Sequence, residues 1–109
     1  MPDPNFVSVR RRADSPFGVI PGDLIDGDPS GYDLSLVRAL TAEGQVVPID
    51  VRAAADGTFE VTDGQKRLAA IRFLVKTNKL VFDRIRGFTR PAREAFALVR
   101  CRTRRPPPA

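Results

Sequence analysis

The stretch Phe59-Glu60-Val61-Thr62-Asp63-Gly64-Gln65-Lys66-Arg67-Leu68-Ala69-Ala70-Ile71 changes its hydrophobic period in the middle. Phe59 and Val61 alternate with polar neighbours, which is typical of a half-buried strand. From Leu68 onward the apolar residues recur at helical spacing. The two patterns meet at Asp63-Gly64. We therefore predict a strand, a tight turn at Gly64, and a helix that runs to about Lys76.

The start of this helix carries an unusual combination of residues. The first N–H groups of a helix lack intrahelical partners and lie at the positive end of the dipole, so a strand-turn-helix corner can bind phosphate. Gly64 allows a ligand to approach the backbone closely. Lys66 and Arg67 are cations where the dipole disfavours them unless an anion is bound. This pattern indicates an anion site.

A purely structural interpretation accounts for the same residues. Thr62 and Gln65 are spaced as in a capping box, in which each side chain satisfies the other residue's backbone N–H. Gly64 would then shape the turn, and Lys66 and Arg67 would be solvated. Spacing alone leaves both interpretations open.

Two segments together resemble a known superfamily. They are Gly44-Gln45-Val46-Val47-Pro48-Ile49-Asp50-Val51 and the run from Asp56 through Asp63-Gly64-Gln65-Lys66-Arg67-Leu68-Ala69-Ala70. Together they look like the core of the ParB/sulfiredoxin-like superfamily, with the likeness covering roughly residues 19 to 76. The resemblance implies an α/β (α+β) fold, in which a small mixed β-sheet packs with helices.

The resemblance also implies a ligand. In chromosome-partition ParB proteins the segment matching Gly64–Arg67 cradles the triphosphate of a cytidine nucleotide, and in sulfiredoxin it binds ATP. CTP or ATP, with Mg²⁺ as a candidate companion, is therefore the expected cofactor. Gly64 and Arg67 become the phosphate-facing positions, with Lys66 replacing the family's Arg or His. The full candidate nucleotide-binding set is Gly44, Pro48, Thr62, Asp63, Gly64, Gln65, Lys66 and Arg67.

Two departures from the family pattern limit the chemistry. Gln65 stands where the partition proteins carry a Glu needed for hydrolysis and where sulfiredoxin carries its reactive Cys. Val47 stands where partition proteins usually carry Gln. Sulfiredoxin chemistry is therefore not expected, whereas NTPase or nuclease activity stays open and the catalytic residues stay unknown.

The other elements are predicted from local patterns. Residues 5–12 predict an opening strand, and residues 13–33 a loop within which 19–25 form a short strand and a helical turn. Asp33 can cap a helix to about Glu43, ended by Gly44. A strand over residues 46–51 contains Pro48, which favours an edge strand or a bulge.

The C-terminal third is less regular. Five apolar residues should be buried, namely Leu80, Val81, Phe82, Ile85 and Phe88. Thr89-Arg90-Pro91 indicates a turn that opens a short helix to about Ala97, and residues 97–102 alternate like a final strand. We expect a single domain over residues 1–102, followed by an Arg/Pro-rich tail at 103–109.

The charge balance favours phosphate-bearing partners. The net charge is +5, and arginine pairs bidentately with phosphate. Non-specific, electrostatic DNA binding is therefore expected, although the arginines near the N-terminus could simply form a solvated strand end. The candidate nucleic-acid contacts are Arg10, Arg11, Arg12, Arg100, Arg102, Arg104 and Arg105.

Composition argues against several other classes of protein. No apolar run is long enough for a transmembrane helix, and no signal peptide is evident, so we expect no membrane partner and a cytoplasmic location. With one Cys and no His, neither an internal disulfide nor a zinc site is expected, and no metal ligands are predicted. Cys101 is interpreted as a small core residue, since no His could activate it.

Three hypotheses from different classes follow. The first is a ParB-like nucleotide-binding, DNA-associated accessory domain of plasmid, chromosome or mobile-element maintenance. The second is a ParB-like nuclease or nucleotidase, against which stands the scatter of Asp56, Asp63 and Asp83. The third is a non-catalytic protein-interaction domain of the same fold, with a homodimer or a larger partner protein as the candidate assembly.

Overall fold

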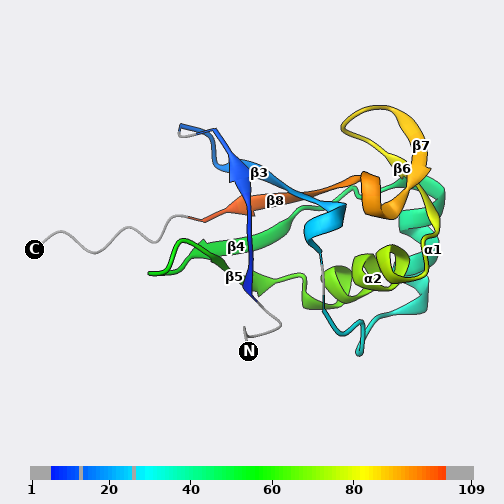
Figure 1. The fold of residues 1–109 in the computed structure, drawn as a ribbon, viewed down its shortest axis with the longest axis horizontal. Helices are drawn as coiled ribbons and strands as arrows, with labels where there is room; N and C mark the ends of the chain where they lie inside the picture. The colour runs from blue at the N-terminus through cyan, green and yellow to red at the C-terminus, as the bar shows by residue number, and fades with distance from the viewer. Residues whose placement is uncertain (1–5, 13, 26, 103–109) are drawn as a thin grey trace, which may run out of the picture.

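The computed structural model describes residues 6–12, 14–25 and 27–102, which form a curled sheet with two helices and a hairpin at one end (Figure 1). The strands are β1 (Phe6–Val7), β2 (Arg10–Arg11), β3 (Phe17–Pro21), β4 (Ile49–Ala53), β5 (Phe59–Asp63), β6 (Leu80–Asp83), β7 (Phe88–Pro91) and β8 (Phe96–Cys101). The helices are α1 (Leu34–Glu43) and α2 (Gln65–Lys76), with 3-10 turns at Gly22–Leu24 and Ala92–Glu94.

The main sheet is mixed and six-stranded, in the order β1-β5-β4-β8-β3-β2. β4 runs parallel to β8, and the other neighbours are antiparallel. β1 and β2 lie at opposite ends of this order although only Ser8 and Val9 separate them in the chain. The sheet must therefore curl so that its two edges approach each other. β6 and β7 form a separate two-stranded hairpin. A mixed α+β architecture is thus confirmed.

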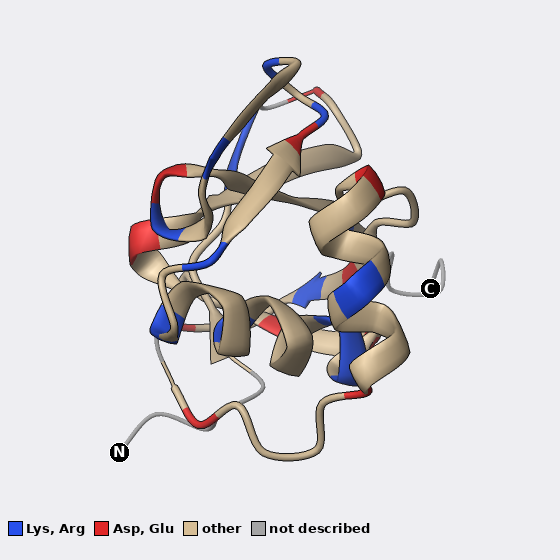
Figure 2. Cartoon of the chain, turned by 90° about the vertical axis from the view of Figure 1, so that its right-hand side faces the viewer, with Lys and Arg blue, Asp and Glu red and all other residues tan. Residues whose placement is uncertain are grey.

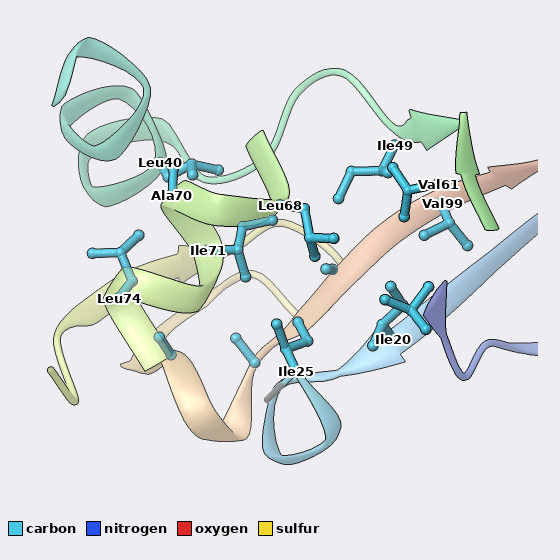
Figure 3. Packing of buried hydrophobic residues seen from close by; sticks show 14 of the residues in the cluster. Ile20, Ile25, Leu40, Ile49, Val61, Leu68, Ala70, Ile71, Leu74 and Val99 are labelled. Atoms are coloured by element: carbon cyan, nitrogen blue, oxygen red, sulfur yellow. The ribbon is translucent and has the colours of Figure 1, made fainter. Parts of the chain in front are cut away.

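The core is formed by apolar residues of the curled sheet and of the helices at its end. Leu68 and Leu74 of α2 are almost completely buried, as are Ile49, Val99 and Ile20 of the strands. Figure 3 shows Leu68 on the side of α2 that faces the strand residues Ile49, Val61 and Val99, and Ala70 beside Leu40 of α1. Burial of this apolar surface fixes α2, and with it the turn at Gly64, against the sheet.

The predicted strand-turn-helix corner is confirmed. β5 ends at Asp63, Gly64 stands alone at the junction, and α2 ends at Lys76. The helix that follows Asp33 and stops at Gly44 is confirmed as well. So are the short strand and helical turn predicted within residues 19–25, now β3 and the turn Gly22–Leu24.

One N-terminal prediction was wrong. The opening strand is two separate two-residue strands, β1 and β2, which pair with β5 and β3. Outside β3 and the turn Gly22–Leu24, the described residues of 13–33 form no helix or strand, as expected, but β3 begins at Phe17 and lies between β2 and β8. Gly18 permits close strand packing there: a Cβ on it would lie 2.8 Å from the Arg10 carbonyl oxygen.

The strand predicted at residues 46–51 begins later, at Ile49, and Val46 and Val47 are exposed. The reason lies in Gln45, whose side chain accepts from the Leu98 N–H at 2.6 Å and donates to the Leu98 carbonyl at 2.7 Å. That side chain occupies the pairing positions of β8 beside this segment. Pro48 is therefore not part of an edge strand, but the expected bulge exists at Asp50–Val51, where the β4–β5 register shifts.

The C-terminal third also differs from the prediction. Val81 is buried, whereas Leu80, Phe82, Ile85 and Phe88 are exposed, because the hairpin presents one face to solvent. No helix runs to Ala97. Ala92–Glu94 form only a 3-10 turn, and β8 begins at Phe96, so the predicted final strand is confirmed with an earlier start. The tail at 103–109 lies outside the described residues.

Candidate functional site

The candidate site is the N-terminal turn of α2. Gly64 has φ 95° and ψ 24°, a left-handed conformation, and no side chain caps the helix. The first intrahelical bond runs from the Leu68 N–H to the Gly64 carbonyl at 2.9 Å. The N–H groups of the residues before Leu68 therefore have no intrahelical acceptor.

The capping-box interpretation was wrong. Thr62 donates its hydroxyl to the Asp50 carbonyl at 3.3 Å, and the Gln65 amide donates to the Val61 carbonyl at 3.3 Å. Both side chains bond to strand carbonyls instead of to each other's N–H. They tie the turn to β4 and β5, and they leave the helix start uncapped.

Arg67 folds back over this turn. Its Nη1 lies 3.5 Å from the point where a Cβ on Gly64 would stand, and the Cα of Ile49 lies equally close to that point. Arg67 is half-buried, and no ion pair joins it to a carboxylate of the described residues. Its guanidinium therefore lies beside the uncapped turn, and no carboxylate of the described residues is its counterion.

Lys66 points to solvent on the same turn. The pKa of Asp33 is lowered mainly by its hydrogen bond from Ser35, and the positive charge of Lys66 also lowers it. Lys66 therefore lies close enough to α1 to act electrostatically on its first turn. It makes no ion pair within the described part of the chain.

An ion-pair cluster lies on the strands beside the turn. Asp50, opposite Asp63 in the β4–β5 register, is buried and accepts from Arg100 Nε at 2.8 Å and Arg100 Nη2 at 3.2 Å. Arg102 Nε lies 3.3 Å from the same carboxylate. The hydrogen bond from Arg100 holds the pKa of Asp50 below its ordinary value although burial opposes this, and it raises the pKa of Arg100.

The predicted nucleotide-binding residues are brought together only in part. Residues 62–67 lie at the strand-turn-helix corner. Pro48 directly precedes Ile49, and Ile49 lies next to Gly64 at that corner. Gly44 is used elsewhere: a Cβ there would lie 2.2 Å from the Phe82 carbonyl oxygen, so Gly44 lets α1 pack against β6. This packing explains the glycine at the end of α1, and a role for Gly44 in phosphate binding stays a prediction.

The predicted nucleic-acid arginines are divided between two situations. Arg10, Arg11 and Arg12 are exposed on and after the edge strand β2, with Arg11 donating to the Ser15 carbonyl at 3.2 Å. Arg100 and Arg102 are engaged by Asp50. Arg104 and Arg105 lie outside the described residues. Figure 2 shows further Lys and Arg segments on both helices and on the hairpin, so the described positive charge is dispersed.

The carboxylates named as possible metal ligands do not converge. Asp56 accepts from Thr58, and Asp83 is buried and accepts from the N–H groups of Ile85 and Arg86. Nowhere in residues 6–12, 14–25 and 27–102 do three Asp, Glu, Cys or His side chains gather as a metal ion would need. A protein-held Mg²⁺ site is therefore not supported by these residues.

Cys101 is confirmed as a buried residue of β8. Burial raises the pKa of its thiol, although the nearby Arg11 acts in the opposite direction. Because only a thiolate is a strong nucleophile, this environment disfavours reactivity.

Sequence reasoning missed Asp50 as the organising carboxylate of the site. The signal was present in Pro48-Ile49-Asp50-Val51, where an acidic residue lies between apolar residues of a strand that is central in the sheet.

Comparisons with protein-family models, curated proteins and solved structures gave no match to this chain. Neither α1 nor α2 in the described part of the chain is long and apolar enough to cross a bilayer.

Proposed function

We propose that this protein is a ParB-like nucleotide-binding, DNA-associated accessory domain that binds nucleotide phosphates at the start of α2. The observation that carries the proposal is the pairing of an uncapped helix start at Gly64 with the Arg67 guanidinium held beside it. Free backbone N–H groups and a neighbouring guanidinium are complementary to a phosphate in geometry and in charge.

Each residue of the turn then has a distinct role. The N–H groups of Gln65 and Lys66 donate to phosphate oxygens, and Gly64 keeps the approach free of a side chain. Arg67 supplies a two-pronged donor, whereas Lys66 supplies a mobile point charge. CTP and ATP are the proposed ligands, by the resemblance to partition proteins and sulfiredoxin.

Binding without hydrolysis is the proposed activity. Gln65 carries a neutral amide, which cannot act as a general base, and it already donates to the Val61 carbonyl. The carboxylates of the described residues do not converge on one point. We therefore propose that any Mg²⁺ binds together with the nucleotide and is not held by protein side chains.

DNA association is proposed to be electrostatic. Arg10, Arg11 and Arg12 extend along and beyond one sheet edge, exposed to solvent. Contacts to phosphates carry no sequence information but make binding fall steeply with salt. Replacing these three arginines with Ala should lower the log-log salt slope by roughly 2 to 3 if each reaches a phosphate. Binding that ignores salt would contradict this part of the proposal.

Calorimetric titration with CTP, ATP and GTP, with and without Mg²⁺, tests the nucleotide part. We expect one saturable site that is weakened by Arg67→Ala and kept by Arg38→Ala, which removes the same charge from an exposed position on α1. Equal affinity of the wild type and Arg67→Ala would reject the phosphate site. Release of inorganic phosphate during the titration would instead favour the nucleotidase hypothesis.

A further inference from the structure

A second feature of the structure is a pocket of about 330 Å³ between α1, α2, the β6–β7 hairpin and β8. Its walls are apolar, and representative lining residues are Leu40, Ile71, Leu74, Val81, Ala92 and Ala97. Figure 3 labels three of them, Leu40 on α1 and Ile71 and Leu74 on α2. All six residues are buried and belong to the hydrophobic core. The pocket is therefore an opening from the protein surface into the core.

The interior of the pocket offers no free polar side chain to a ligand. Gln45 lines it, but its amide is occupied by the backbone of Leu98 and by the Val47 carbonyl. The side chains that a ligand would meet inside are therefore mainly apolar. Val46, at the lining and 57% exposed, adds an apolar side chain at the solvent boundary.

The charged residue among those lining the pocket is Arg84. Its Cγ lies 2.9 Å from the point where a Cβ on Gly44 would stand, so its stem crosses the end of α1. Arg84 is exposed, and no ion pair joins it to a carboxylate of the described residues. The pocket thus combines an apolar interior with one uncompensated guanidinium.

We propose that this pocket binds a medium-length aliphatic carboxylate, with the chain inside and the carboxylate paired with Arg84. A dry cavity of roughly 150 Å³ holds benzene, so this volume suits about a dozen non-hydrogen atoms. Decanoate has that size. Sites for small ligands are usually of this kind, apolar with a few convergent polar groups.

The chemistry is tested with three probes of equal chain length. Sodium decanoate, kept below micelle-forming concentrations, should give one saturable site by calorimetry. Decanol should bind roughly tenfold more weakly, because it lacks the charge-assisted bond to Arg84. Decyltrimethylammonium should bind more weakly still. Equal affinity for decanoate and decyltrimethylammonium, or no saturable binding of decanoate, overturns the proposal.

Adjacent residues provide a matched control for the location. Val46→Asp places a negative charge at the pocket, whereas Val47→Asp makes the same change at a neighbour that is 50% exposed and does not line it. Val46→Asp should weaken decanoate binding at least about tenfold by charge repulsion, and Val47→Asp less than about twofold. Equal effects of the two variants would show that decanoate binds elsewhere.

Two further variants separate the chain from the charge. Ala97→Leu should fill the pocket and abolish binding in protein whose circular dichroism is unchanged. Arg84→Gln should bring decanoate and decanol to similar affinities. If Arg84→Gln lowers the melting temperature but leaves the preference for decanoate intact, Arg84 serves only the carbonyl end of α1 and the assignment is wrong.

Discussion

The two helices begin in opposite ways. At the start of α1, the Asp33 carboxylate accepts from the Ser35 N–H at 2.9 Å and from the Ser35 hydroxyl at 2.6 Å. At the start of α2, the corresponding position is Gly64, which has no side chain to offer. One helix start has a side-chain cap from within the chain, whereas the other has none.

The charged residues in the first turns of α1 and α2 also differ. The first turn of α1 has a negative cap and no cation, as the helix dipole favours. The first turn of α2 contains Lys66 and Arg67 and no acid. Residues that conflict with local helix preferences are expected at functional sites, where a ligand supplies the missing partner. The contrast with α1 therefore supports the proposal that an anion binds at the start of α2.

The largest expected effect concerns Arg67. Replacing Arg67 with Ala should weaken binding of CTP or ATP by about 1.5 to 3 kcal/mol, the scale of a hydrogen bond between charged groups. Lys66→Ala should cost less, because lysine acts as a point charge. Calorimetric titration measures both variants. If Lys66→Ala weakens nucleotide binding more than Arg67→Ala does, the Arg67 guanidinium does not donate hydrogen bonds to the phosphate.

The next effect concerns the carboxylate that braces the sheet beside the turn. Asp50→Asn should lower the free energy of unfolding at neutral pH by about 1 to 3 kcal/mol, because Arg100 loses its charged acceptor. The folded-state pKa of Asp50 lies below its ordinary value of 3.8, so its contribution is present above that pH and is lost as the pH falls through the folded pKa.

Urea denaturation across this pH range checks the prediction. The wild type should converge on Asp50→Asn in acid, while the two differ at neutral pH. A difference that is constant from neutral pH into acid would contradict the role assigned to the Asp50 charge.

Gly64→Ala separates the conformation of the turn from its ligand. Forcing a Cβ into the left-handed region should destabilise the fold by about 1 kcal/mol, and the nearest atoms to that Cβ, at 3.5 Å, add no clash. Gly57→Ala is the control, since Gly57 has φ +87° and no atom within 4 Å. Thermal melts should show similar losses, but only Gly64→Ala should also weaken nucleotide binding.

The smallest effect is expected at the satisfied helix start. Asp33→Ala removes the α1 cap and should lower the melting temperature modestly, whereas Asp33→Ser keeps a capping oxygen and should lower it less. Neither change removes a donor at the α2 start. Should Asp33→Ala abolish nucleotide binding in folded protein, the two helix starts would not be the independent units described above.

The sequence predicted the corner at Gly64 because three local signals coincide there: a period of two, a glycine, and a period near 3.6. The same local reasoning failed for residues 46–51, because Gln45 pairs with Leu98, a residue far away in the chain.

The candidate site was predictable to a similar extent. Lys66 and Arg67 stand out as cations in a first turn, and that conflict is visible in the sequence. The capping box could not be rejected without coordinates, because spacing does not say which carbonyl a side chain reaches. The pairing of Asp50 with Arg100 and Arg102 depends on the parallel contact between β4 and β8, which no local pattern encodes.

The contrast between the two helix starts can be measured directly by following backbone amide resonances while CTP or ATP is added. We predict that the amide signals of Gln65, Lys66 and Arg67 shift and saturate together, while those of Leu34, Ser35 and Leu36 stay in place. Saturating shifts that leave residues 65–67 unmoved, or equal shifts at both helix starts, would contradict it.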